Sequence, residues 1–179
     1  TGTSINQNPS YEYASTGQYT ATLVVTTVSG CTDTTIAQII VNPGATANFS
    51  STNVCLGEVS SFSDMSSANV TSWQWDFQDG NSSNIENPTN TFASSGSFDV
   101  ELVVGTSTGC TDTITNTVTI FPLPTINAGP DVTICSGDDA LLTATGAQSY
   151  VWNPSTVNNG QFFTPITSGI YTVTGTDAN

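Results

Sequence analysis

Apolar and polar residues alternate along several short segments of the chain, most clearly in residues 97–105. Every second residue is apolar there: Phe98, Val100, Leu102 and Val104. The residues between them are Asp99, Glu101 and Val103. A period of two places one set on the buried face of a β-strand and the other on a mostly solvent-exposed face. The same pattern near the N-terminus predicts a strand whose buried face carries Tyr19, Ala21, Leu23 and Val25.

Residues 44–122 contain seven short segments that we interpret as strands, separated by turns that contain Gly, Asn and Asp. Trp73, Trp75 and Phe77 share one face of a strand, and we expect this face in the core because polar residues alternate with the rings. No segment shows helical periodicity with capping residues. Seven short strands in about 80 residues predict an all-β fold, an antiparallel immunoglobulin-like β-sandwich. The expected strands are 46–50, 58–64, 70–77, 81–84, 88–93, 97–105 and 112–121.

An internal repeat sets the domain organisation. Residues 30–34, Gly-Cys-Thr-Asp-Thr, recur without change at 109–113, a shift of 79 residues. The divergent C-terminal region opens with Cys135-Ser136-Gly137, which matches Cys55-Leu56-Gly57. The repeat therefore predicts tandem modules: the second half of one module in 1–43, a complete module in 44–122 and a partial module in 123–179.

Charge restricts the chemistry of the chain, which has 14 acidic residues and no Lys, Arg or His. Binding to nucleic acid or to anionic lipid needs cationic side chains, so both partners are excluded. Nucleophilic triads, Schiff bases and His-ligated zinc are excluded as well. A glycosidase-like carboxylate pair stays formally open, but we expect no enzyme. No apolar stretch is long enough to insert into a membrane, no signal peptide is present, and we interpret the chain as a piece of a longer protein.

The four cysteines predict disulfides that stabilise the modules. We expect a bridge between Cys55 and Cys110, whose loop closure would contribute on the order of 4 kcal/mol. Cys31 matches Cys110 and Cys135 matches Cys55, so their partners are expected outside the chain. The alternatives are free thiols in a reducing compartment and metal ligation, which the lack of a CxxC motif disfavours.

A short segment that begins within the Trp73 strand and continues into the turn after it resembles the hallmark of the PKD (polycystic kidney disease) domain family. The residues that carry the resemblance are Trp75, Asp76, Phe77, Asp79 and Gly80. An Asn-Pro pair at 87–88 and the strand Gly96-Ser97-Phe98-Asp99-Val100 follow as they do in that family. Gln78 stands where the family usually has Gly, so we expect this turn to be shaped slightly differently. The resemblance is strong for 44–122, clear for 1–43 and looser for 123–179.

The resemblance also implies a biological setting. The Cys-x-Gly opening and the Gly-Cys-Thr-Asp-Thr closing are similar to repeats of large Bacteroidota proteins exported by the type IX secretion system. Such proteins act as adhesins or surface filaments. Asp112-Thr113-Ile114 resembles the O-glycosylation motif of that group, which makes Thr113 a candidate acceptor; an ordinary strand start is the alternative.

The acidic residues give two candidate calcium sites, and no other cofactor is expected. Asp76 and Asp79 flank a tight turn, and Asp131, Asp138 and Asp139 cluster near the start of the third module. Carboxylate and carbonyl oxygens suit Ca²⁺. The alternative is that the Asp side chains cap backbone N–H groups of their turns.

These patterns predict a non-enzymatic structural or adhesive repeat segment of a secreted surface protein, located outside the cell. Its partners would be neighbouring repeats, other copies in a surface assembly or a cell-surface ligand. The absence of Lys and Arg leaves trypsin-like proteases no cleavage site, although compositional drift would give the same pattern. Two alternatives are a carbohydrate- or protein-binding accessory module of a secreted hydrolase and a filament subunit completed by neighbouring chains.

Overall fold

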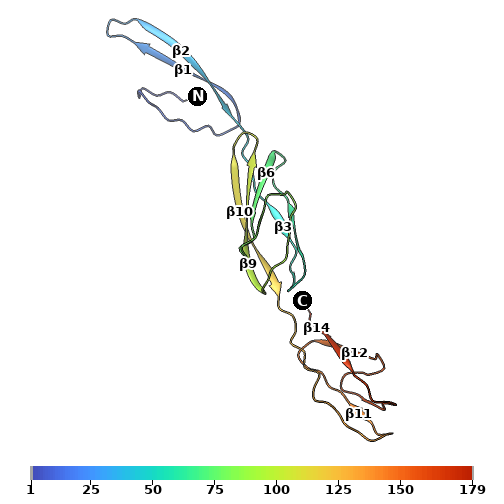
Figure 1. The fold of residues 1–179 in the computed structure, drawn as a ribbon. Coiled ribbons are helices and arrows are strands. Elements are labelled where there is room, and N and C mark those ends of the chain that lie inside the picture. The colour runs from blue at the N-terminus through green and yellow to red at the C-terminus, as the bar shows by residue number, and fades with distance from the viewer. Residues whose placement is uncertain (1, 179) are drawn as a thin grey trace. The chain divides into compact units, whose positions relative to one another are not determined.

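The structure is a computed structural model that describes residues 2–178, and all of its regular elements are β-strands (Figure 1). No described residue lies in a helix, which confirms the predicted all-β class. Within this part of the chain there is accordingly no helix long and apolar enough to cross a membrane.

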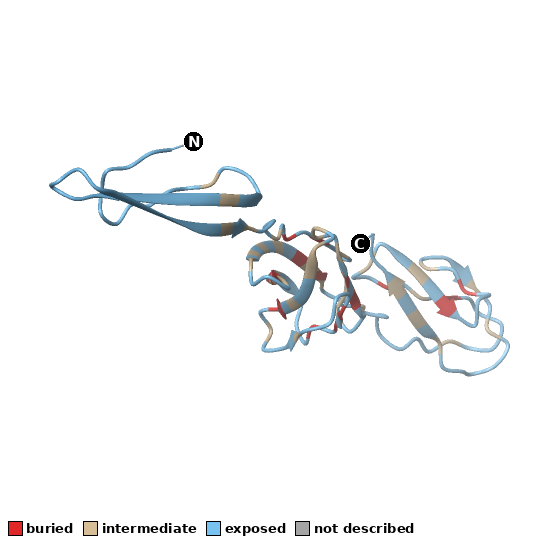
Figure 2. Ribbon diagram, turned by 90° about the horizontal axis from the view of Figure 1, so that it is seen from above, coloured by how far each residue is buried: buried red, intermediate tan, exposed pale blue. Residues whose placement is uncertain are grey.

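Residues 2–43 hold one long hairpin. β1 (Gly17–Thr26) pairs antiparallel with β2 (Thr32–Val41) along their full length. The predicted burial of every second β1 residue is wrong: Tyr19 is half-buried, but Leu23 is 57% exposed. The two strands form a two-stranded sheet of their own, so their apolar side chains have no second layer to pack against, and Figure 2 shows the hairpin mostly exposed.

The middle module folds into the predicted sandwich of two sheets. One sheet has the strand order β3-β5-β8 and the other β4-β10-β9-β6-β7. β4 pairs parallel with β10, so the sandwich is not wholly antiparallel. The sequence missed β4 because a two-residue strand is too short to show a period. The bounds are β3 Phe49–Ser51, β4 Val54–Cys55, β5 Ser60–Asp64, β6 Val70–Asp76, β7 Ser82–Ser83, β8 Thr89–Asn90, β9 Gly96–Thr106 and β10 Thr111–Phe121.

Aromatic rings fill the centre of this sandwich. Trp75 is fully buried, and its ring centroid lies 5.0 Å from that of Phe49 and 5.6 Å from that of Phe62. The ring centroid of Phe77 lies 5.0 Å from that of Phe62. Each such pair contributes about 0.5–1.5 kcal/mol beyond burial of its area. Trp75 and Phe77 confirm the predicted core face, whereas Trp73 is only half-buried.

Strand β9 confirms the alternation predicted from the sequence. Val100, Leu102 and Val104 are buried, while Glu101 and Val103 are half-buried. One face of the strand therefore packs against the core of the middle module, and the other stays accessible to water.

The C-terminal region forms two small sheets. β11 (Ala140–Leu141) pairs with β13 (Phe162–Phe163), and β12 (Ser149–Asn153) pairs with β14 (Thr172–Thr176), both antiparallel. Trp152 is the centre of a small core, and partly buried side chains pack against it, among them Leu142, Phe163 and Tyr171.

The division into three modules stays a prediction. The chain separates into two compact units, and the boundary between them runs through the strands of the middle module. The hairpin, the middle sandwich and the C-terminal sheets are therefore described one by one.

Candidate functional site

The turn after β6 holds the residues that carry the family resemblance. Asp76 Oδ1 accepts a hydrogen bond from the Gln78 N–H at 2.8 Å, and Asp79 Oδ1 accepts one from the Asn81 N–H at 2.9 Å. Gln78 has a φ of 59° and Gly80 a φ of 93°, so the backbone passes twice through the left-handed region that favours glycine. The structure supports the interpretation in which both Asp side chains cap backbone N–H groups.

A polar network anchors this turn to strand β8. Asn90, which is 8% exposed, donates from Nδ2 to Asp79 Oδ2 at 2.7 Å. The Asn81 amide donates to the same Asp79 oxygen and to Asn90 Oδ1, both at 3.1 Å. Sequence reasoning missed Asn90, although an Asn inside the predicted strand 88–93 is a usable signal because Asn is depleted in strands.

The second acidic cluster, near the C-terminal sheets, has scattered partners. Asp139 Oδ1 accepts a hydrogen bond from Thr164 Oγ1 at 2.5 Å, and the Asp138 N–H donates to the Cys135 carbonyl at 3.1 Å. Asp131 lines a groove. Across residues 2–178, no group of three His, Cys, Asp or Glu side chains is placed to hold a metal ion. Calcium binding stays a prediction.

The predicted disulfide between Cys55 and Cys110 is absent, and both residues are free thiols. Cys110 directly precedes β10, whereas Cys55 pairs with Phe121, the last residue of that strand. The two cysteines thus lie at opposite ends of β10. The position of Cys55 depends on the pairing of the two-residue strand β4 with the far end of β10, which no short-range sequence signal predicts. Cys31 and Cys135 are free and exposed, and their partners outside the chain stay a prediction.

The candidate glycosylation site lies at the start of β10. Thr113 is exposed, and the carboxylate of Asp112 accepts a hydrogen bond from the Ala47 N–H at 2.8 Å. Asp112 therefore has a structural role that ties the first residues of the module to β10. Glycosylation of Thr113 stays a prediction.

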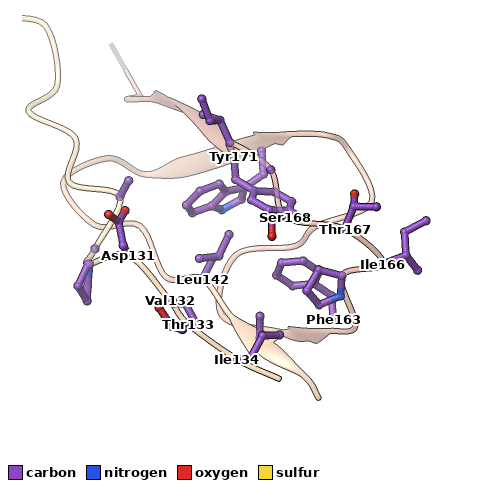
Figure 3. Close-up of a pocket in the computed structure, with 18 of the residues that line it drawn as sticks. Asp131, Val132, Thr133, Ile134, Leu142, Phe163, Ile166, Thr167, Ser168 and Tyr171 are labelled. Atoms are coloured by element: carbon purple, nitrogen blue, oxygen red, sulfur yellow. The ribbon is translucent and has the colours of Figure 1, made fainter. Parts of the chain in front are cut away.

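The C-terminal region has a groove of about 720 Å³ (Figure 3). Leu142, Phe163 and Tyr171 contribute apolar side chains to it, and Ile134 lines it from the segment that matches β4. The rest of the lining comes mainly from residues 128–136, before β11, and from residues 165–171, before β14.

Comparisons with known proteins agree with this fold. The family model of the PKD domain matches residues 40–121. No curated protein sequence matches the chain.

The solved structures that match part of the chain include two PKD domains. The PKD1 domain of Vibrio anguillarum Epp is 27% identical, with a TM-score of 0.43, and the match covers 46% of this chain and 99% of that domain. The PKD1 domain of the Vibrio cholerae metalloprotease PrtV is 28% identical, with a TM-score of 0.41, covering 44% of this chain and 99% of that domain. A carbohydrate-binding module of the β-sandwich superfamily is 21% identical, with a TM-score of 0.45, covering 49% of this chain and 38% of that one.

The residues that match the PKD family model are those of the middle module, which folds into an immunoglobulin-like sandwich of two β-sheets. PKD domains are modules of extracellular proteins. The match identifies a PKD domain and no catalytic domain.

Proposed function

We propose that this chain is a non-enzymatic, load-bearing repeat segment of a large surface protein or extracellular appendage that mediates attachment. The observation that carries the proposal is the repetition of one hairpin. In both copies the turn closes with the same bonds: Cys31 N–H to Thr27 Oγ1 and Cys110 N–H to Thr106 Oγ1, each at 3.1 Å. A unit repeated in such detail suits a spacer that projects a contact site away from a cell.

The pairing of β4 with β10 supports a mechanical role. The two strands run parallel, with Val54 opposite Ile120 and Cys55 opposite Phe121. The Leu56 N–H donates to the Phe121 carbonyl at 2.8 Å, and the Thr119 N–H donates to Asn53 Oδ1 at 2.9 Å. Tension that pulls residue 44 and residue 122 apart slides these strands in opposite directions. The bonds between them are then loaded together rather than one by one.

The surface chemistry supports the same role. Asp76 and Asp79 are used as turn caps, and Asp112 holds the first residues of the module. The chain offers trypsin-like proteases no Lys or Arg, which suits a protein exposed outside the cell. The extracellular location and export by type IX secretion are parts of this proposal.

Single-molecule pulling of the full chain, attached at its two ends, tests the mechanical role. Unfolding of residues 44–122 is expected as one cooperative event that releases about 28 nm of chain at up to ~3.6 Å per residue. Asn53→Ala removes the side-chain bond to Thr119 and is expected to lower the unfolding force. Asn84→Ala, a matched change at an exposed loop residue, should leave the force unchanged. Extension without a distinct unfolding event would overturn the load-bearing role.

A glycan array probed with the same chain separates the proposal from the accessory-module alternative. The proposal predicts no selective retention of soluble glycans. Selective, saturable binding to one glycan class would favour the accessory role instead.

A further inference from the structure

The two cysteines of the middle module are too far apart to bond to each other. Ten peptide units separate the first and last residues of β10, and one more leads back to Cys110. At ~3.3 Å per residue, Cys110 lies about 36 Å along the strand from Phe121, the residue opposite Cys55. A disulfide needs Cα atoms within ~7 Å. The sandwich therefore keeps its two thiols separate as long as it is folded.

The two cysteines of the middle module lie at opposite ends, or poles, of the sandwich. At the N-terminal pole, where the chain enters, the Ala47 N–H bonds to Asp112 two residues after Cys110. At the C-terminal pole, where the chain leaves β10, the Phe121 carbonyl accepts from the Leu56 N–H one residue after Cys55. Cys110 is thus the N-pole cysteine of this module, and Cys55 is its C-pole cysteine.

The other two cysteines repeat these two settings. Cys31 closes the β1–β2 turn with the same bond to a threonine hydroxyl that Cys110 makes. The Cys135 carbonyl accepts from the Asp138 N–H at 3.1 Å, as the Cys55 carbonyl accepts from the Glu58 N–H at 3.0 Å. A glycine with positive φ follows two residues later in both cases, Gly57 at 91° and Gly137 at 95°. The cysteines therefore alternate along the chain between N-pole and C-pole positions.

We propose that the C-pole cysteine of one module forms a disulfide with the N-pole cysteine of the module that follows it. In a tandem array the C-terminal pole of each module is succeeded by the N-terminal pole of the next, so the two kinds of cysteine meet at junctions. The recognised partner is another copy of this module, and the sulfur bridges lie between modules instead of inside them. The proposal rests on tandem repetition and stands whether or not the array bears load.

Thiol accessibility fits this arrangement. Cys31 and Cys135 are exposed, and Cys55 and Cys110 are half-buried. The proposed pair consists of a C-pole cysteine and the N-pole cysteine of the next module, and residues 1–179 contain no such pair. The N-pole cysteine Cys110 shares a module with the C-pole cysteine Cys55, and it precedes the C-pole cysteine Cys135. Four free thiols in this chain are what the proposal expects.

Bond formation needs a disulfide oxidant, either a small-molecule disulfide or a thiol–disulfide oxidoreductase. One cysteine thiolate attacks the S–S bond of the oxidant and releases one reduced thiol. The second thiolate attacks the protein sulfur of this mixed disulfide and releases the other. Two protein thiols thus lose two electrons and two protons, and one oxidant disulfide becomes two thiols.

The test uses the full chain with residues 44–122 duplicated in tandem and with all cysteines but two replaced by Ser. In the junction variant, Cys55 is kept in the first copy and Cys110 in the second. In the reversed variant, Cys110 is kept in the first copy and Cys55 in the second, so that the thiols lie at the outer poles. Both are incubated with oxidised glutathione, and linked peptides are counted by non-reducing mass spectrometry.

The junction variant is expected to form the intramolecular link on the order of tenfold or more faster than the reversed variant, because only it holds the thiols at high effective concentration. The same pair in urea provides the unfolded control, in which the difference should disappear. Equal rates in the folded proteins, or no link in the junction variant, would overturn the proposal. A Cys55–Cys110 link within the unduplicated, folded 179-residue chain would overturn it independently.

Discussion

At the scale of single residues, the turn after β6 shows how polar side chains replace the salt bridges that this chain lacks. Asp76 and Asp79 accept backbone N–H groups, and Asn90 fixes Asp79 from the neighbouring sheet. Gln78 stands at a φ of 59°, where the related family usually has Gly. The turn keeps its shape because the flanking caps hold a residue that prefers another conformation.

Replacing this residue by glycine is expected to stabilise the middle module. Gln78→Gly relieves a left-handed conformation that costs a residue with a Cβ about 1–2 kcal/mol, partly offset by the greater chain entropy of glycine when unfolded. We expect a net gain of about 0.5–1 kcal/mol, measured by urea unfolding followed through tryptophan fluorescence. Gln74→Gly, in extended strand β6, is the matched control and should destabilise. Equal destabilisation by both changes would contradict the strain.

Removing the buried amide of Asn90 is expected to destabilise the same turn. Asn90→Ala deprives Asp79 Oδ2 of its 2.7 Å partner and Asn81 Nδ2 of an acceptor. Loss of buried partners of this kind costs about 1–3 kcal/mol. Asn84→Ala, at an exposed position, should change the free energy of unfolding by less than ~0.5 kcal/mol. Thermal unfolding of both variants provides the comparison, and equal melting temperatures would refute a structural role for the network.

At the scale of the element, β1 and β9 carry the same alternation in different surroundings. Leu23 and Leu102 are counterparts in the repeat, yet Leu23 is 57% exposed and Leu102 is fully buried. β9 lies inside a five-stranded sheet that faces an aromatic core, whereas β1 belongs to a two-stranded sheet. Local pattern produced both strands, but only one of them has a second sheet against its apolar face.

This pair of leucines gives a matched test of what burial contributes. Leu102→Ala leaves a cavity in the core and is expected to lower the free energy of unfolding by about 2–5 kcal/mol. Leu23→Ala is expected to change it by less than ~0.5 kcal/mol. Both are measured by urea unfolding of the full chain, followed through tryptophan fluorescence. A similar loss of unfolding free energy in both variants would show that the side chain of Leu23 is buried in solution.

At the scale of the whole molecule, the charged side chains all carry the same sign and repel one another. Fourteen acidic side chains have no cationic partner on any side chain, so every electrostatic interaction between charged side chains is unfavourable. Burial of aromatic rings, sheet hydrogen bonds and capped turns must outweigh this repulsion. In a longer array, cross-links between modules would add to them.

Salt is therefore expected to stabilise the chain. Raising NaCl from ~20 mM to ~300 mM shortens the screening length to well below ~10 Å and should raise the melting temperature by a few degrees. A decrease would contradict the repulsive balance. CaCl₂ at matched ionic strength should give the same increase if screening alone acts, and a clearly larger increase would support the predicted calcium sites.

The sequence was most informative where local pattern and local chemistry decide the outcome. The strand of Phe98 to Val104, the buried Trp75 and the capped turn of Asp76 and Asp79 were all predictable from period and residue type. Asn90 and the two-residue strand β4 were not, because each depends on a partner distant in sequence. The Cys55–Cys110 bridge was predicted wrongly for the same reason.

The amino-acid sequence alone thus determined the all-β class, the repeat and the alternation of apolar and polar residues in the long strands, because alternation and turn chemistry act over a few neighbouring residues. Only the tertiary structure decided which of two similar strands is buried and which ends of the sandwich the cysteines occupy. Those outcomes depend on which strands become neighbours in a sheet. The parallel pairing of β4 with the end of β10 fixes the position of Cys55, and no short-range signal records it.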